Sequence, residues 1–376
     1  MFAGQGVKSL RYPAAPWFVV LQETMKVDQD KLNAFLMKFV GDFGAALHAS
    51  TVLVGEKLGL YKALAEGNGL SPAELAGKTR TMERYVREWL SAQAAAGYVM
   101  YDSKTSKYSM SPEQVFTLAD EKSPAYLPGA FYIAASMFKD EAGITEAFRT
   151  GKGFGWEQHS TDLFQGAEKF FRPAYAGNLV SSWLPALDGV VAKLKNGAMV
   201  ADVGCGYGAS TMIMAEAFPK SRFVGYDFHK PSIDYARKTA SANHLSDRVS
   251  FEQAKAQDYP KKDFDLVTFF DCLHDMGDPA GAAKHVRQSL KPDGTWMIVE
   301  PFANEKPEQN YNPVGRVYYS ASTMICTPAS KAQEVGLALG AQASDSQLRQ
   351  VIMSGGFKTF RRATETPFNR VFEAKP

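Results

Sequence analysis

The chain has 376 residues, 45% of them hydrophobic and 22% charged, which is enough material for more than one hydrophobic core. Its formal net charge of +2 is too balanced to predict a nucleic-acid or membrane-surface partner, because such partners usually leave a concentrated basic face. The three cysteines are odd in number and widely spaced, and no apolar stretch has the length of a membrane span. We therefore expect a cytoplasmic protein without a metal site.

The first third of the chain predicts an arm followed by a small domain. Residues 1–30 have no clear period and are expected to form the arm, and residues 31–120 are expected to form the domain. Ser71 and Glu74 have the spacing of a capping box, with Pro72 at the first helical position. The expected helices are 32–47, 50–64, 71–76 and 81–95, and the expected hairpin strands are 97–101 and 107–110.

Helices followed by a hairpin are typical of a winged helix, which raises the hypothesis of DNA binding. The recognition helix would then be 81–95. It carries Arg84 and Arg87, but Glu83 and Glu88 cancel part of their charge. We therefore favour a dimerisation domain, because a fold does not by itself imply its best-known function.

Residues 121–195 predict a helical linker or lid rich in aromatic side chains. Trp156, His159 and Tyr175 are candidates for the wall of a substrate pocket. The alternative is that they belong to the hydrophobic core.

In residues 196–376, strands and helices alternate, which predicts an α/β fold with a doubly wound, mostly parallel sheet. The last two strands are close enough for a hairpin, so we expect the final strand to be antiparallel. The expected strands are 198–203, 222–227, 249–253, 264–271, 294–300, 357–363 and 370–374.

The most informative stretch is M-V-A-D-V-G-C-G-Y-G-A-S, residues 199–210, a buried strand followed by a glycine loop. This pattern fits both dinucleotide enzymes and methyltransferases that use S-adenosylmethionine (SAM), and Asp227, at the end of the next strand, could hold a ribose in either. Asp202 favours SAM, because a carboxylate beside the loop would repel a pyrophosphate and would attract the sulfonium and ammonium of SAM.

These motifs, taken together, resemble the class I SAM-dependent methyltransferases with an N-terminal winged-helix domain, including small-molecule O-methyltransferases and a bacterial group sometimes labelled transcriptional regulators. The resemblance is carried by KLGLY at 57–61, ADVGCG at 201–206, FDCLHDMGDP at 270–279 and ETPFN at 365–369. It implies a Rossmann-like sheet of seven strands in the order 3-2-1-4-5-7-6 with the last-numbered strand antiparallel. It also implies SAM as cofactor and S-adenosylhomocysteine (SAH) as product.

The resemblance also implies a cofactor site. Its glycine loop would approach the methionyl part of SAM, Asp227 would hold the ribose and Phe228 would flank the adenine. Lys255 stands where many relatives have an acid that binds the adenine amino group, so Ala256 or Gln257 is expected to replace that acid. The expected cofactor residues are Asp202, Gly204, Gly206, Asp227, Phe228, Ala256, Gln257, Asp271 and Cys272.

The pattern His274-Asp275-x-x-Asp278 resembles a stretch of O-methyltransferases whose histidine is the general base. A histidine has a pKa near neutrality and could take a hydroxyl proton as the methyl group arrives. Glu300 ends the fifth strand and is expected to orient His274. Tyr318 and Tyr319 are further candidates for an acceptor pocket.

The sequence thus predicts a homodimeric SAM-dependent methyltransferase that acts on a small organic acceptor, at a hydroxyl oxygen, with His274 as base. Three alternatives stay open. They are a SAM-sensing winged-helix transcriptional regulator, an N- or C-methyltransferase of the same fold, and a nicotinamide oxidoreductase.

Overall fold

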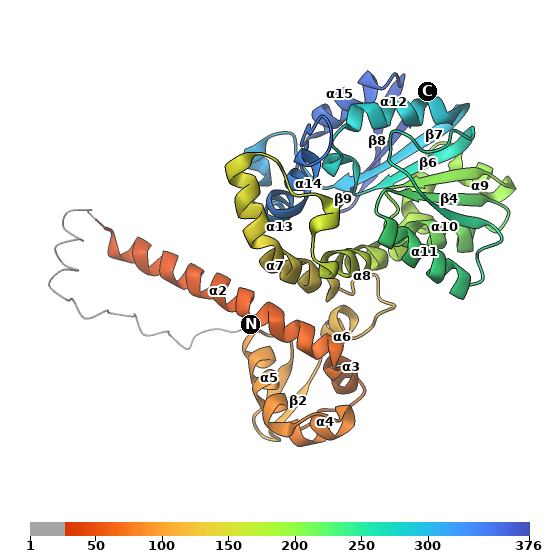
Figure 1. Ribbon diagram of the computed structural model, residues 1–376. Helices are drawn as coiled ribbons and strands as arrows, with labels where there is room; N and C mark the ends of the chain where they lie inside the picture. Colours follow the sequence, from red (N-terminus) through yellow and green to blue (C-terminus); the bar gives the residue numbers. More distant parts are fainter. Residues whose placement is uncertain (1–26) are drawn as a thin grey trace. The chain divides into compact units, whose positions relative to one another are not determined.

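The computed structural model describes residues 27–376, which form two compact units, one ending at Ser111 and one beginning at Pro112 (Figure 1). Each unit has its own fold. The predicted arm, residues 1–30, lies almost wholly outside the described residues.

The first unit is mainly helical. The capping box predicted at Ser71 and Glu74 is present at the start of α4, with both reciprocal hydrogen bonds formed. Arg84 and Arg87 of α5 form ion pairs of 2.6 and 2.7 Å with Glu88 and Glu83. The unit contains α2 (Gln29–Lys57), α3 (Leu60–Ala65), α4 (Pro72–Thr79), α5 (Glu83–Ala95), β1 (Met100–Asp102) and β2 (Lys107–Ser109).

The predicted helices 32–47 and 50–64 are wrong in their break, because α2 runs through that point without interruption. Ser50 and Thr51 are accommodated in the helix, since each hydroxyl donates to a carbonyl oxygen three residues earlier. The true break is at Gly59, whose φ of 67° is in the left-handed region that glycine adopts easily.

The second unit begins with helices that precede the sheet. Pro173 lies within α8, which continues into a π-helical turn at Leu179–Trp183. The helices are α6 (Pro112–Leu118), α7 (Gly129–Thr150), α8 (Thr161–Asn178) and α9 (Val190–Asn196), with a 3₁₀ turn at Trp156–Gln158 and another at Leu184–Ala186.

The seven-stranded sheet has the order β5-β4-β3-β6-β7-β9-β8, and β9 is antiparallel to both of its neighbours. Numbered within the sheet, this is 3-2-1-4-5-7-6, so the predicted fold is confirmed. The strands are β3 (Met199–Val203), β4 (Arg222–Asp227), β5 (Val249–Gln253), β6 (Phe264–Phe270), β7 (Leu290–Pro301), β8 (Thr359–Glu365) and β9 (Asn369–Lys375).

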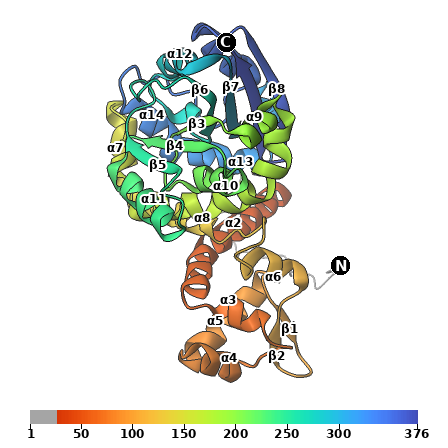
Figure 2. The same cartoon turned by 90° about the vertical axis from the view of Figure 1, so that its right-hand side faces the viewer.

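Helices cover both faces of the sheet and bury alternate strand residues (Figure 2). Val200 packs with α9, α10 and α11, whereas its neighbour Ala201 packs on the other face, with α12 and α15. The remaining helices are α10 (Ala209–Ala217), α11 (Lys230–Ala242), α12 (Pro279–Ser289), α13 (Pro313–Ala321), α14 (Thr327–Lys331) and α15 (Asp345–Ser354). Within residues 27–376, every helix is too short or too polar to cross a bilayer.

Candidate functional site

A cavity of about 840 Å³ lies within the second unit, at the carboxyl ends of β3, β4 and β6. Ligands bind at this edge of a doubly wound sheet, where the strand order reverses. The cavity brings together most of the residues that the sequence predicts, namely Gly204, Gly206, Asp227, Phe228, Ala256, Gln257, Asp271, Cys272, Trp156 and Tyr175.

The glycine loop between β3 and α10 forms one wall of this cavity. Gly204, Gly206 and Gly208 have φ values of 74°, 52° and 81°. A Cβ atom on Gly204 would lie 2.7 Å from the Sγ of Cys272, and one on Gly208 would lie 2.5 Å from the ring of Phe251. Glycine is therefore required for both the conformation and the close packing of the loop.

Asp227 ends β4 and holds the loop in place. One carboxylate oxygen accepts the N–H of Gly206 at 2.9 Å, and the other accepts the N–H of His229 at 2.8 Å. Burial raises the pKa of Asp227, while these hydrogen bonds lower it. Each oxygen keeps a free lone pair, so the carboxylate can accept two hydroxyl groups from the cavity.

Asp202 does not line the cavity, contrary to the expectation that it meets the cations of SAM. Its carboxylate lies beneath the loop and accepts hydrogen bonds from the hydroxyls of Ser210, Thr211 and Thr268 at 2.6, 2.5 and 3.0 Å. Burial raises its pKa to about 6. Asp202 therefore fastens the start of α10 to β3 and β6.

The side chains expected near an adenine are at the cavity wall beyond β4 and β5. Phe228 is partly exposed there, and Lys255, Ala256 and Gln257 follow β5. Gln257 donates its side-chain N–H to the carbonyl oxygen of Asp278 at 3.2 Å. Its amide oxygen remains available as an acceptor.

His274 and Glu300 form the predicted pair, with 2.6 Å between Nδ1 and a carboxylate oxygen. His274 is only 4% exposed and does not line the cavity. Burial acts to lower its pKa, but the charge of Glu300 and a hydrogen bond with Cys326 outweigh burial, so the pKa is well above its usual range. The predicted pair of His274 and Glu300 is thus present, but His274 is not part of the cavity wall.

Three of the predicted substrate residues lie outside the cavity wall. His159 is buried, with Nδ1 2.9 Å from a carboxylate oxygen of Asp140. Tyr318 donates its hydroxyl to the carbonyl oxygen of Phe368 at 2.6 Å, and Tyr319 is the next residue of α13. The side chains of His159 and Tyr318 are thus held by hydrogen bonds within the second unit, and the ring of Tyr319 contacts the exposed Tyr311.

The sequence analysis missed a charged pair on α8 that faces the cavity. Arg172 Nε lies 2.8 Å from a carboxylate oxygen of Glu168, and both residues line the cavity. Phe164, Glu168, Phe171 and Tyr175 recur at intervals of three or four residues, which places them on one face of the helix. This periodicity in the sequence could have predicted which face of the helix lines the cavity.

Two family models match parts of the chain. Residues 194–341 match the model of a methyltransferase domain, and residues 45–119 match the Rv2258c-like winged helix-turn-helix domain. The first match covers the glycine loop, Asp227 and the His274–Glu300 pair.

Curated relatives of the chain are methyltransferases as well. The demethylmenaquinone methyltransferase of Lactobacillus johnsonii is 32% identical over 111 residues, which are 29% of this chain and 46% of that protein. The chain spans about half the length of the curated relatives it matches.

Two solved structures share the whole architecture. A candidate O-methyltransferase from Nostoc punctiforme has a TM-score of 0.68 at 18% identity, covering 90% of this chain and 98% of that one. Human N-acetylserotonin methyltransferase in complex with SAM has a TM-score of 0.63 at 16% identity, covering 90% and 97%. The chain therefore carries a methyltransferase domain with a SAM-binding fold, preceded by a winged helix-turn-helix domain.

Proposed function

We propose that the protein is a SAM-dependent methyltransferase that transfers a methyl group to a hydroxyl oxygen of a small organic acceptor. The observation that carries the proposal is the cavity beside the glycine loop, with Asp227 at the end of β4. SAM supplies the methyl group, as an electrophile on a sulfonium.

The residues of the cavity fit this cofactor. Asp227 has free lone pairs for the two ribose hydroxyls, and Gly206, which has open space where a Cβ would lie, lets a ligand approach the backbone. The Arg172–Glu168 pair offers opposite charges to the carboxylate and the ammonium of the methionyl group. SAM carries no phosphate and needs no anion site at the loop.

His274 is the proposed base. Glu300 holds Nδ1, so the other ring nitrogen is the one that can take a proton from an acceptor. The Cys326 thiol, in the π-helical turn Ser322–Cys326, also interacts with the His274 ring. Since His274 is not among the residues that line the cavity, the proposal requires the acceptor to reach the ring beyond the cavity wall.

Calorimetry with SAM, SAH and NAD tests the cofactor. We expect SAM and SAH to bind with micromolar affinity and NAD to bind weakly or not at all. Asp227→Asn should weaken both SAM and SAH by about tenfold, because a charged acceptor contributes about 1.5–3 kcal/mol to a hydrogen bond. Binding of NAD in place of SAM would overturn the proposed function.

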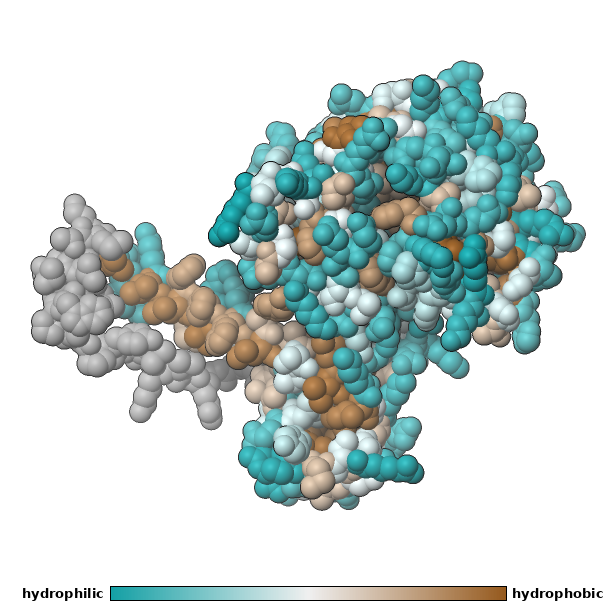
Figure 3. All heavy atoms as spheres, in the orientation of Figure 1, coloured by the Kyte–Doolittle hydropathy of each residue, from teal (hydrophilic) through white to brown (hydrophobic). Residues whose placement is uncertain are grey.

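The winged-helix unit is proposed to form a homodimer through α2. Its first half presents an apolar stripe at intervals of four residues, visible as brown along the helix in Figure 3. The stripe consists of Phe35, Phe39, Phe43 and Leu47, which are 65%, 57%, 55% and 58% exposed. A stripe of this kind on a helix suits packing against an identical helix of a second copy.

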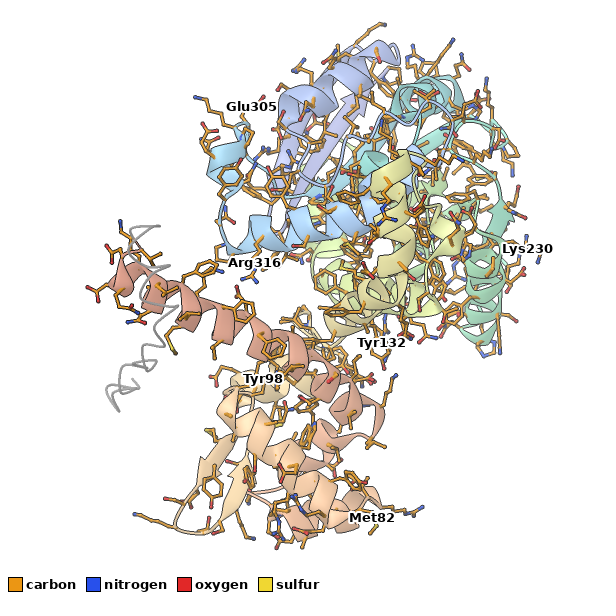
Figure 4. All side chains as sticks on the ribbon, turned by 60° about the vertical axis from the view of Figure 1, so that its left-hand side comes forward. Met82, Tyr98, Tyr132, Lys230, Glu305 and Arg316 are labelled. Atoms are coloured by element: carbon orange, nitrogen blue, oxygen red, sulfur yellow. The ribbon has the colours of Figure 1, made fainter. Side chains whose placement is uncertain are left out.

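The first unit has few features that favour binding to DNA. Both arginines of α5 that were considered for DNA contact are paired with glutamates of the same helix. Met82, labelled in Figure 4, is the N-cap residue of α5, and Tyr85 lies on that helix; both side chains are exposed. We therefore place the partner of this unit among proteins.

The dimer is tested by light scattering with size-exclusion chromatography. Wild type is expected at twice the mass of the chain, and the double variant Phe39→Glu, Phe43→Glu at the mass of one chain. Phe148→Glu is the matched control, since Phe148 is even more exposed, at 72%, but lies on α7. A dimer that survives the double variant would refute the role of α2.

A further inference from the structure

The residue that follows strand β6 has a strained backbone. Asp271 follows the strand directly and has a φ of 50°, in the left-handed region that costs a non-glycine residue about 1 kcal/mol or more. Its N–H donates to the carbonyl oxygen of Val299 at 2.8 Å, which ties it to β7. Strain of this kind persists where the surrounding structure fixes the residue, and Asp271 lines the cavity.

The carboxylate of Asp271 is fixed by two other elements. One oxygen accepts the hydroxyl of Tyr175, on α8, at 3.0 Å, and the other accepts the side-chain N–H of Asn369, on β9, at 3.0 Å. Both donors are neutral, so they orient the carboxylate without balancing its charge. Each oxygen keeps a lone pair for the cavity.

The position of Asp271 is that of the topological switch point. The strand order reverses between β3 and β6, so the glycine loop after β3 and the residues after β6 face the same ligand. The segments after β3 and β6 are close together, because the Sγ of Cys272 lies 3.4 Å from the carbonyl oxygen of Val203. A group bound against the loop at this point therefore lies beside Asp271.

We propose that Asp271 senses the charge of the cofactor, so that the site favours SAM over its product SAH. The inference rests on the proposed function. The two molecules differ by one methyl group and by the positive charge on the sulfur, while ribose, adenine and amino-acid groups are shared. A fixed carboxylate next to that sulfur attracts the first and has little effect on the second.

The ionisation of Asp271 makes this preference measurable. Burial and then the charge of Glu300 raise its pKa to about 7, so the carboxyl of the free site is partly protonated near neutral pH. A cation nearby lowers that pKa, so binding of SAM should expel the proton. Binding of SAH should leave it in place. The titratable groups that face Asp271 are Tyr175 on α8, Glu300 on β7, Tyr318 on α13, and His274 and Asp275 in the following turn.

The test is calorimetry of SAM and SAH at pH 7 in two buffers with different ionisation enthalpies. We expect release of a fraction of a proton with SAM and almost none with SAH. As the pH rises from 6 to 8, the affinity for SAM should increase, because the ionised carboxylate predominates, while the affinity for SAH stays level. Asp271→Asn should abolish the difference in proton release and reduce the preference for SAM by about tenfold.

Asp265→Asn is the matched control. Asp265 lies at the opposite end of β6 from Asp271 and is not among the residues that line the cavity. That variant should keep the proton release and the preference for SAM. Equal proton release with SAM and SAH, or loss of the effect in Asp265→Asn as well as in Asp271→Asn, would overturn the inference and leave the proposed function intact. Failure of wild type to bind either molecule would instead overturn the proposed function.

Discussion

His274→Ala is expected to lower the rate of methyl transfer by at least about 100-fold while leaving the affinity for SAM almost unchanged. General bases contribute about 10²–10⁴-fold to a rate, and His274 lies outside the wall of the cofactor cavity. The measurement is conversion of SAM to SAH with an acceptor found in a panel of phenols and other hydroxylated compounds. Calorimetry gives the affinity for SAM.

The pH dependence of the same reaction carries a second signature. Burial acts to lower the pKa of His274, but the contributions of Glu300 and Cys326 together raise it well above its usual range, so the imidazole is protonated at neutral pH and cannot accept a proton. The rate should therefore rise with pH above neutrality in wild type. In His274→Ala this rise should be lost.

Cys326→Ala is the matched control for His274. It removes the thiol that interacts with the ring but keeps the bond between His274 and Glu300. We expect a rate at least equal to that of wild type. If Cys326→Ala lost as much activity as His274→Ala, the three side chains would be a structural cluster, and a near-normal rate in His274→Ala would exclude it as the base.

The sheet could be predicted from the sequence because its strands are short apolar runs separated by clear turns. The predicted 222–227 and 249–253 agree with β4 and β5 at both ends. The break in α2 could not be predicted in the same way. A helix end is predicted between residues 47 and 50, but the hydroxyls of Ser50 and Thr51 bond within the helix, and the helix ends just before Gly59.

The residues of the candidate site could be predicted where the local backbone conformation determines their position. Glycines in a loop and an acid at a strand end follow from local geometry, and Gly204 and Asp227 lie where they were expected. The direction of a side chain depends on distant partners. His159 is held by Asp140, and Asp271 by Tyr175 and Asn369 from other elements, and neither contact leaves a mark in the nearby sequence.

The side-chain contacts of Asp202 could not be predicted from the nearby sequence either, and its substitution is expected to have a large effect on stability. Asp202→Ala should lower the free energy of unfolding by about 3 kcal/mol, because three buried hydroxyls lose their shared acceptor and each unsatisfied group costs about 1–3 kcal/mol. Removal of a buried carboxylate offsets part of this cost. A thermal melt of the variant should show a midpoint lower by on the order of 10 °C.

Asp202→Asn separates the structural role from a role of the charge. The amide oxygen can still accept two of the three hydroxyls, and its N–H group can donate to the third, so most of the stability should return. If Asp202 only fastens the loop, this variant binds SAM within a few-fold of wild type. Loss of SAM binding in a fully stable Asp202→Asn would restore the expectation that the negative charge itself attracts the cofactor. In that case the carboxylate would act through the glycine loop, since it has no place in the cavity wall.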